Sequence, residues 1–152
     1  MQFIHTDIRE IVQEVYDKLT PLAKNKDISL SLNQPDTEVI LPVERDTLTE
    51  AVYNIADNSI KYTEPGGSIE VIAEKNDSAV IISVSDTGAG IAPEDLSKVK
   101  QKFYKANKTK HGSGIGLAVA DEIITMHGGL LDIESELGKG TKVTITLPLK
   151  NG

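Results

Sequence analysis

The sequence predicts an α+β fold, a two-layer sandwich in which one mixed sheet of about five strands carries three main helices on one face. Three segments have apolar residues at helical spacing, and five to seven shorter runs resemble strands. The strand runs follow one another as hairpins rather than as regular strand-helix-strand units, which argues against a doubly wound nucleotide fold. The length of 152 residues fits a single domain over residues 1–152, and no repeat or linker divides the chain.

The first half of the chain is expected to contain two helices and two strands. Both helices have an apolar stripe with the period of an α-helix, and both have boundary signals. Thr6 or Asp7 provides the N-cap of the first helix, and Pro65-Gly66-Gly67 ends the second. The predicted ranges are 8–19 and 44–62 for the helices, and 28–32 and 39–43 for the strands.

The second half is expected to contain two strand pairs with helices between them. The cluster Lys75-Asn76-Asp77-Ser78 is typical of a hairpin turn, and a second hairpin crosses residues 137–140. The last long helix ends at about His127, where Gly128-Gly129 caps it. The predicted ranges are 68–74, 79–85, 130–134 and 141–147 for the strands, and 93–100 and 115–127 for the helices.

The composition excludes several classes of protein. Sixteen Lys and Arg against 23 Asp and Glu give a net charge of −7, so we expect no nucleic-acid partner. Between Leu96 and Ala120 there are six lysines and no acidic residue, which leaves −13 for the rest of the chain. With no cysteine, a disulfide framework or a cysteine-bound zinc is excluded and a reducing, cytoplasmic location is expected. No apolar run reaches about 20 residues, so we expect no direct membrane insertion by this segment.

The first motif with chemical content lies on the second predicted helix. Asn54, Asn58, Lys61 and Tyr62 share one polar face of that helix, opposite its apolar stripe. Amide oxygens are neutral, hard ligands that suit Mg²⁺, and a lysine one turn further on would meet phosphate oxygens. Taken alone, this face is more typical of a solvated helix surface than of a binding site.

The second motif, Asp86-Thr87-Gly88-Ala89-Gly90, follows a predicted strand. A carboxylate at the end of a strand can accept a hydrogen bond from an exocyclic amino group such as that of adenine. The two glycines allow the backbone to approach a flat ring closely. As an isolated sequence, this turn is common in proteins without a bound nucleotide.

The third motif, Gly112-Ser113-Gly114-Ile115-Gly116-Leu117, opens the last long helix. Backbone N–H groups and the positive end of a helix can converge on phosphate oxygens there. The motif does not follow a strand within a strand-helix-strand unit, so it fits neither the Rossmann nor the Walker pattern.

Together and in this order, the three motifs resemble the nucleotide-binding domain of sensor histidine kinases. The resemblance covers residues 3–149 and implies the ATP-binding (Bergerat) sandwich, with a left-handed crossover, shared with DNA gyrase, mismatch-repair ATPases and heat-shock chaperones. The matching segments are residues 54–63 (N box), 86–90 (G1 box), 103–105 (F box) and 112–117 (G2 box), with residues 138–141 and 147–149 at the end.

The resemblance also implies roles for individual residues. Asp86 would pair with adenine and Thr141 would contact it through water, whereas Asn58, helped by Asn54, would coordinate Mg²⁺. Lys61 and Lys105 would face the phosphates, and residues 98–113 would form a lid over the ATP. Asn54, Asn58 and Lys61 are the expected catalytic residues. The expected nucleotide-binding residues are Asn54, Asn58, Lys61, Tyr62, Asp86, Gly88, Gly90, Ile91, Tyr104, Lys105, Gly112, Ser113, Gly114, Ile115, Gly116, Leu117 and Thr141.

The related ATPases have a glutamate four residues before the metal-binding asparagine, as a base for water. With Asn58 on the metal, that position holds Asn54, whose amide is no base, so we expect poor hydrolysis and transfer to a histidine instead. Glu50 and Asn54 offer a second register, in which the chain resembles a serine kinase of the anti-sigma-factor type. The sequence is also compatible with a slow ATPase switch on the same fold and with an interaction module that binds no nucleotide.

The phosphoacceptor histidine is not expected within this chain. None of its histidines, His5, His111 and His127, lies in the H-E-x-x-T-P context of the family's acceptor helix. The resemblance therefore implies that the partners are the dimerisation helices of the same kinase, which carry the acceptor, and a response regulator. The parent kinase would be cytoplasmic in this part and could be anchored to a membrane.

Overall fold

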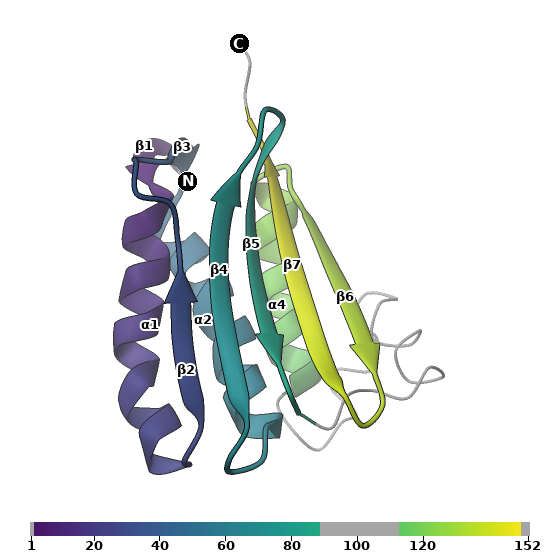
Figure 1. The fold of residues 1–152 in the computed structure, drawn as a ribbon. Coiled ribbons are helices and arrows are strands. Elements are labelled where there is room, and N and C mark those ends of the chain that lie inside the picture. Colours follow the sequence, from purple (N-terminus) through teal and green to yellow (C-terminus); the bar gives the residue numbers. More distant parts are fainter. Residues whose placement is uncertain (1, 89–112, 150–152) are drawn as a thin grey trace.

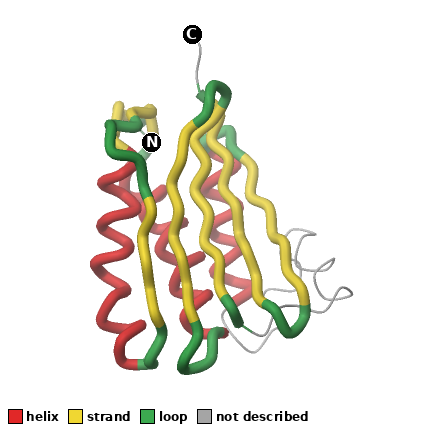
Figure 2. Tube along the Cα trace, viewed as in Figure 1, coloured by secondary structure: helices red, strands yellow, loops and turns green. Residues whose placement is uncertain are grey.

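The computed structural model describes residues 2–88 and 113–149, and these form two layers (Figure 1). Three helices cover one face of a five-stranded sheet (Figure 2), which confirms the predicted α+β sandwich. The sheet has the order β2 (Ser29–Asn33), β4 (Ser68–Lys75), β5 (Ala79–Asp86), β7 (Gly140–Pro148) and β6 (Leu130–Glu136). The helices are α1 (Ile8–Asn25), α2 (Arg45–Tyr62) and α4 (Ser113–Met126). The predicted helix at 93–100 lies outside the described residues.

The sheet is mixed, as the strand pattern predicts. β2 and β4 are parallel, and the other three pairs are antiparallel. The chain passes from β2 to β4 through α2, which lies behind the sheet in Figure 1, and β4 lies to the right of β2. This is a left-handed crossover, the rare sense for parallel strands. On the way the chain forms β3 (Ile40–Val43), which pairs with β1 (Ile4–Asp7) in a separate two-stranded sheet.

Helix α1 starts where the cap signal predicts and ends later than predicted. The carboxylate of Asp7 accepts a hydrogen bond from the backbone N–H of Arg9 at 3.1 Å, as an N-cap does. The helix then continues past Leu19 and through Pro21 to Asn25, because Ala23, one turn after Leu19, extends the stripe that is buried in the core. The prediction that the helix ends at Leu19 is therefore wrong by nearly two turns.

Helix α2 carries the polar face predicted to bind metal and phosphate, and both of its ends are fixed by side chains. At its start, Glu44 accepts a hydrogen bond from the backbone N–H of Thr47 at 2.9 Å. At its end, the ammonium group of Lys26 donates to the carbonyl oxygens of Ile60 (2.8 Å) and Lys61 (2.9 Å). A cation at the C-terminus of a helix satisfies free carbonyl groups and opposes the negative end of the helix dipole.

The core lies between the sheet and the helices. Alternate residues of β4, β5 and β7 and the inner stripes of α1, α2 and α4 are buried there. Helix α4 begins at Ser113, two residues before the predicted start, so residues 113–117 of the glycine-rich motif belong to the start of this helix. None of the helices in the described part of the chain is long and apolar enough to cross a membrane.

Candidate nucleotide-binding site

Three polar side chains form a row across the sheet at the end of β5. Asp86 lies opposite Thr141 on β7, and Thr141 lies opposite Ser135 on β6. Residues opposite one another in antiparallel strands point to the same face. The row continues on the other side of Asp86 to Ile69, which is buried in the core. This polar row, formed by Asp86, Thr141 and Ser135, therefore lies on the helix-covered face, where the apolar core ends.

The carboxylate of Asp86 is held by backbone groups through one oxygen. Its Oδ1 accepts hydrogen bonds from the N–H of Gly88 at 2.8 Å and from the N–H of Thr141 at 3.2 Å. No described residue donates to Oδ2. Because an ionised carboxylate only accepts hydrogen bonds, this arrangement leaves an oriented acceptor for a ligand that carries an amino group.

Two glycines allow the chain to come close to this carboxylate. A Cβ atom on Gly88 would lie 2.5 Å from the carbonyl oxygen of Tyr62 and 3.0 Å from Oδ1 of Asp86. A Cβ atom on Gly140, whose φ is +134°, would collide with the carbonyl oxygen of Asp86. Both positions therefore require glycine, and Gly88 brings the end of α2 against the turn that follows Asp86.

The polar face of α2 contains half-exposed amides. Asn54 and Asn58 are partly exposed, whereas the neighbouring Ile55, Ala56 and Ser59 are buried in the core. No described residue makes a hydrogen bond with either amide. Their oxygens are thus free to act as metal ligands, and they are of the type that Mg²⁺ prefers. Among the described residues, no cluster of three or more His, Asp or Glu forms another metal site.

Lys61 and Tyr62 lie at the exposed end of the same helix. The ammonium group of Lys61 is 3.5 Å from Oδ2 of Asp57, one turn earlier. The Lys61 side chain is 56% exposed, so this ion pair is weak and its lysine can turn to another anion. Tyr62 is 40% exposed.

Thr63 follows Tyr62 and is fully buried beside Gly88. Its hydroxyl oxygen has no hydrogen-bond partner in the described part of the chain. A buried hydroxyl without a partner is unusual, and it lies next to the turn that carries the carboxylate.

The first turn of α4 brings a group of backbone donors to the same end of the molecule (Figure 1). The backbone N–H groups at the start of a helix lack partners within it and form the positive end of its dipole. Here they belong to Ser113, Gly114, Ile115 and Gly116, whereas Leu117 is 5% exposed in the core. The remaining predicted binding residues, Gly90, Ile91, Tyr104, Lys105 and Gly112, lie outside the described residues, as does most of the predicted lid at 98–113.

Two residues at this end were not predicted to belong to the site. Ser135 enters through the register of β6 with β7, and Lys26 through its bonds to the end of α2. Ser135 precedes the hairpin at 137–140 and Thr141 follows it. Pairing the two predicted strands across that hairpin places Ser135 and Thr141 opposite each other, so the strand register is the signal that could have identified Ser135.

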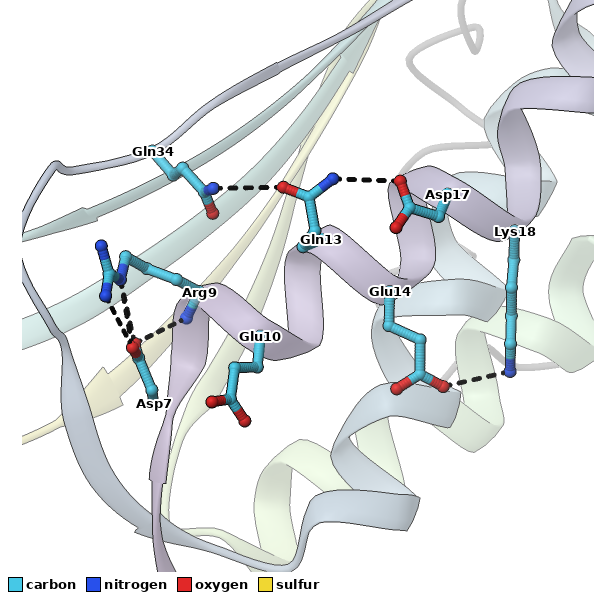
Figure 3. Close-up of a pocket in the computed structure, with 8 residues that line it drawn as sticks. All are labelled: Asp7, Arg9, Glu10, Gln13, Glu14, Asp17, Lys18 and Gln34. Atoms are coloured by element: carbon cyan, nitrogen blue, oxygen red, sulfur yellow. Dashed lines mark hydrogen bonds and ion pairs between the residues drawn. The ribbon is translucent and has the colours of Figure 1, made fainter.

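A hollow of about 530 Å³ on the outer side of α1 is unsuited to a nucleotide (Figure 3). Its lining contains four carboxylates and two cations, and each of the two cations, Arg9 and Lys18, pairs with a carboxylate of the lining. The Arg9 guanidinium, joined by the backbone N–H groups of Val39 and Arg9, holds the pKa of the Asp7 carboxyl below its usual range. This surface would repel a triphosphate. Its lining residues are Asp7, Arg9, Glu10, Gln13, Glu14, Asp17, Lys18 and Gln34.

Known proteins are similar to this chain in sequence and in fold. The family model for histidine kinase-, DNA gyrase B- and HSP90-like ATPases matches residues 43–151. Sensor protein SrrB of Staphylococcus aureus is 42% identical over 109 residues, which are 69% of this chain and 19% of that protein. The chain therefore spans about a fifth of the length of this relative.

Solved structures of histidine kinases have the same fold. The catalytic domain of the histidine kinase ThkA superimposes with a TM-score of 0.83 at 23% identity, over 97% of this chain and 96% of that one. The mycobacterial sensor histidine kinase MprB gives 0.79 at 26% identity, over 96% and 97%. Full-length ShkA in complex with AMPPNP gives 0.81 at 26% identity, over 99% of this chain and 32% of that one. The chain is homologous to sensor histidine kinases and belongs to the family of histidine kinase-, DNA gyrase B- and HSP90-like ATPases.

Proposed function

We propose that the chain is the ATP-binding catalytic domain of a sensor histidine kinase, which binds Mg-ATP and transfers the γ-phosphoryl group to a histidine on a separate dimerisation domain. The observation that carries this proposal is the carboxylate of Asp86, oriented by the N–H groups of Gly88 and Thr141. An acceptor fixed in this way is complementary to the amino group of adenine. Family membership supports the same ligand.

The residues around Asp86 fit the rest of a nucleotide. The amide oxygens of Asn58 and Asn54 have the chemistry to hold Mg²⁺, which would neutralise phosphate charge when bound. Lys61 is exposed and only weakly paired, so it can turn to a phosphate oxygen. The N–H groups in the first turn of α4 provide further donors for phosphate. In this proposal Tyr62 lines the purine or ribose.

The chain contributes positioning and charge rather than a base. Asn54 occupies the position where related ATPases have a glutamate, and an amide cannot take a proton from water near neutral pH. A neutral imidazole needs no such base, because its nitrogen lone pair attacks the γ-phosphorus directly. The bond from phosphorus to the β–γ bridging oxygen breaks, and ADP leaves with the electron pair.

A second assignment places Asn54 on the metal and Glu50 as the base of a serine kinase or slow ATPase. Glu50 is exposed on α2, eight residues before Asn58. The two assignments differ by four residues, so at 1.5 Å per residue the second one places both the metal ligand and the base about 6 Å further from the end of the helix that meets Gly88. That distance favours Asn58 as the metal ligand.

The phosphoacceptor helices and the response regulator are proposed partners that lie outside this chain. The relatives matched by sequence are several times longer than the chain, which leaves room in them for acceptor and sensor domains. We propose a cytoplasmic location for this domain, because ATP and the response regulator would have to reach it there.

A phosphotransfer assay tests the function. The chain is mixed with γ-labelled Mg-ATP and with two-helix acceptor domains from sensor kinases, and the labelled acceptor is treated with acid and with base. Label that is lost in acid and kept in base indicates phosphohistidine and supports the proposal. Acid-stable label on serine would establish a serine kinase instead, and a lack of nucleotide binding would leave only an interaction module.

Two single variants decide between the two registers. Asn58→Ala is expected to abolish Mg-ATP binding and transfer. Asn33→Ala removes an exposed amide at the end of β2 and is the matched control, with no expected effect. Near-normal binding by Asn58→Ala, together with an inactive Asn54→Ala, would reverse the assignment.

A further inference from the structure

Helix α2 ends without the glycine cap that many helices use. Thr63, which follows the helix, is extended (φ −104°, ψ 132°), so the chain leaves α2 without a left-handed residue that turns later N–H groups back onto the last carbonyls. Among the described residues beyond the helix, only the backbone N–H of Thr63 returns to one of these carbonyls, that of Ile60, at 3.4 Å. The last carbonyl groups of α2 therefore depend on a donor from elsewhere in the chain.

Lys26, the residue that follows α1, supplies this donor. Its ammonium group donates to the carbonyl oxygen of Ile60 at 2.8 Å and to that of Lys61 at 2.9 Å. Because one group holds two successive carbonyls, it fixes the orientation of the last turn of α2. The side chain of Lys61 projects from this turn.

Two backbone hydrogen bonds join the same two segments independently of the ammonium group. The N–H of Gly66 donates to the carbonyl oxygen of Asp27 at 2.7 Å, and the N–H of Ser29 donates to that of Gly67 at 3.0 Å. The end of α1 should therefore stay attached to the turn after α2 when the Lys26 ammonium group is removed. This allows the task of the ammonium group to be tested in a folded chain.

We propose that Lys26 is a positioning residue of the nucleotide site, which holds the last turn of α2 so that Lys61 is directed to the phosphates of the nucleotide. This inference rests on the proposed binding of Mg-ATP. The ion pair of Lys61 with Asp57 is exposed and weak, so it does not fix the end of the helix. A long side chain on a frayed turn has to be ordered when the ligand binds, which lowers the affinity. A turn that is held in advance avoids this loss.

Lys26→Met keeps most of the length of the side chain and its apolar stem but removes the donor. We expect the dissociation constant for Mg-ATP to rise about tenfold, because the last turn of α2 must then be ordered on binding. The carboxylate of Asp86 is held by the N–H groups of Gly88 and Thr141, which Lys26 does not contact. The acceptor for the base should therefore stay in place.

The test is calorimetric titration of the chain and its variants with Mg-ATP, with urea unfolding to measure their stability. Lys26→Arg retains a cationic donor and should bind Mg-ATP within about twofold of the original chain. Lys24→Met makes the same chemical change in the exposed last turn of α1 and is the matched control, with no expected effect. If Lys26→Met does not fold, Lys26→Gln replaces it, because its shorter side chain cannot hold both carbonyls.

A double variant shows whether the effect passes through Lys61. In a chain that carries Lys61→Met, the further change Lys26→Met should weaken Mg-ATP binding by less than about twofold. An effect of the same size with and without Lys61 would overturn the inference.

A merely structural role of Lys26 would give a different result. Lys26→Met would then unfold at a lower urea concentration, but the folded chain would bind Mg-ATP with the original affinity. That result would overturn the inference while the proposed function stands. If the original chain does not bind Mg-ATP, the proposed function is itself wrong.

Discussion

Replacement of Asp86 by asparagine separates recognition of the base from stability of the fold. An asparagine can keep its Oδ1 as the acceptor for the N–H groups of Gly88 and Thr141, so the local structure should persist. What changes is the second atom, where an NH₂ donor replaces Oδ2. This donor would face the amino group of adenine, which is also a donor.

The size of the effect follows from the bond that is lost. A hydrogen bond to a charged group contributes about 1.5–3 kcal/mol, so the affinity for Mg-ATP should fall by roughly 10- to 150-fold. The free energy of unfolding should change by less than about 0.5 kcal/mol. In contrast, Asp86→Ala leaves the buried N–H of Gly88 without an acceptor and should destabilise the fold by about 1–3 kcal/mol.

Calorimetric titration gives the affinity, and urea unfolding gives the stability. Asp77→Asn, in the exposed turn between β4 and β5, makes the same chemical change away from the site and is the control. The new amide should also bind inosine triphosphate, whose purine carries an oxygen, O6, in place of the amino group, better than ATP, because it can donate to O6. If Asp86→Asn binds Mg-ATP within twofold of the original chain, Asp86 does not contact the base and the argument fails.

Three further predictions concern stability. Gly140→Ala should lower the free energy of unfolding by at least about 2 kcal/mol, because its Cβ would overlap a backbone oxygen. Gly138→Ala is the control: its φ is +83° and the space around it is open, so it should lower the free energy of unfolding by about 1 kcal/mol, as measured for both variants by urea titration. The pKa of Asp7 is lowered by folding, so its stabilisation is complete above its unfolded pKa of about 4 and is lost as the pH falls through the folded value. Asp7→Asn should therefore cost about 1 kcal/mol in unfolding titrations at pH 7 and much less at pH 2, and an equal loss at both would contradict the sign. Thr63→Val removes a buried hydroxyl without a described partner and should raise the free energy of unfolding by up to about 1 kcal/mol. The melting temperature should therefore rise, and a fall in the melting temperature would show that the hydroxyl has a partner.

The sequence predicts the elements well where the deciding signal is local. The start of α1 at Asp7 and the turn at residues 75–78 depend on neighbouring residues, and both are found as predicted. The predicted end of α1 is wrong because the apolar stripe was followed only to Leu19, whereas the burial of Ala23 in the core extends the helix by a further turn and more.

The residues of the candidate site also fall into two groups: those that a sequence motif identifies and those that only strand register brings to the site. The Asp86 motif is visible in the sequence, but its partner Thr141 is 55 residues away and is brought there by the register of β5 with β7. Ser135 carries no motif of its own, and only the pairing of β6 with β7 places it in the polar row. Residue patterns thus identify the groups that could act, while strand register decides which of them meet.

For the proposed ATP complex, the charge balance of the described residues predicts a task for the lysine-rich segment between Leu96 and Ala120. At the end of α2, the ammonium group of Lys26 is already bonded to two carbonyl oxygens, and that of Lys61 is paired with Asp57. If Lys61 turns to a triphosphate, it leaves Asp57 behind as an unpaired negative charge. The described part of the site therefore gains little net positive charge for a ligand that carries several negative charges. In the proposed ATP complex, Mg²⁺ and the six lysines between Leu96 and Ala120 would provide most of the remaining neutralisation, and we expect ATP affinity to fall steeply as salt screens those lysines.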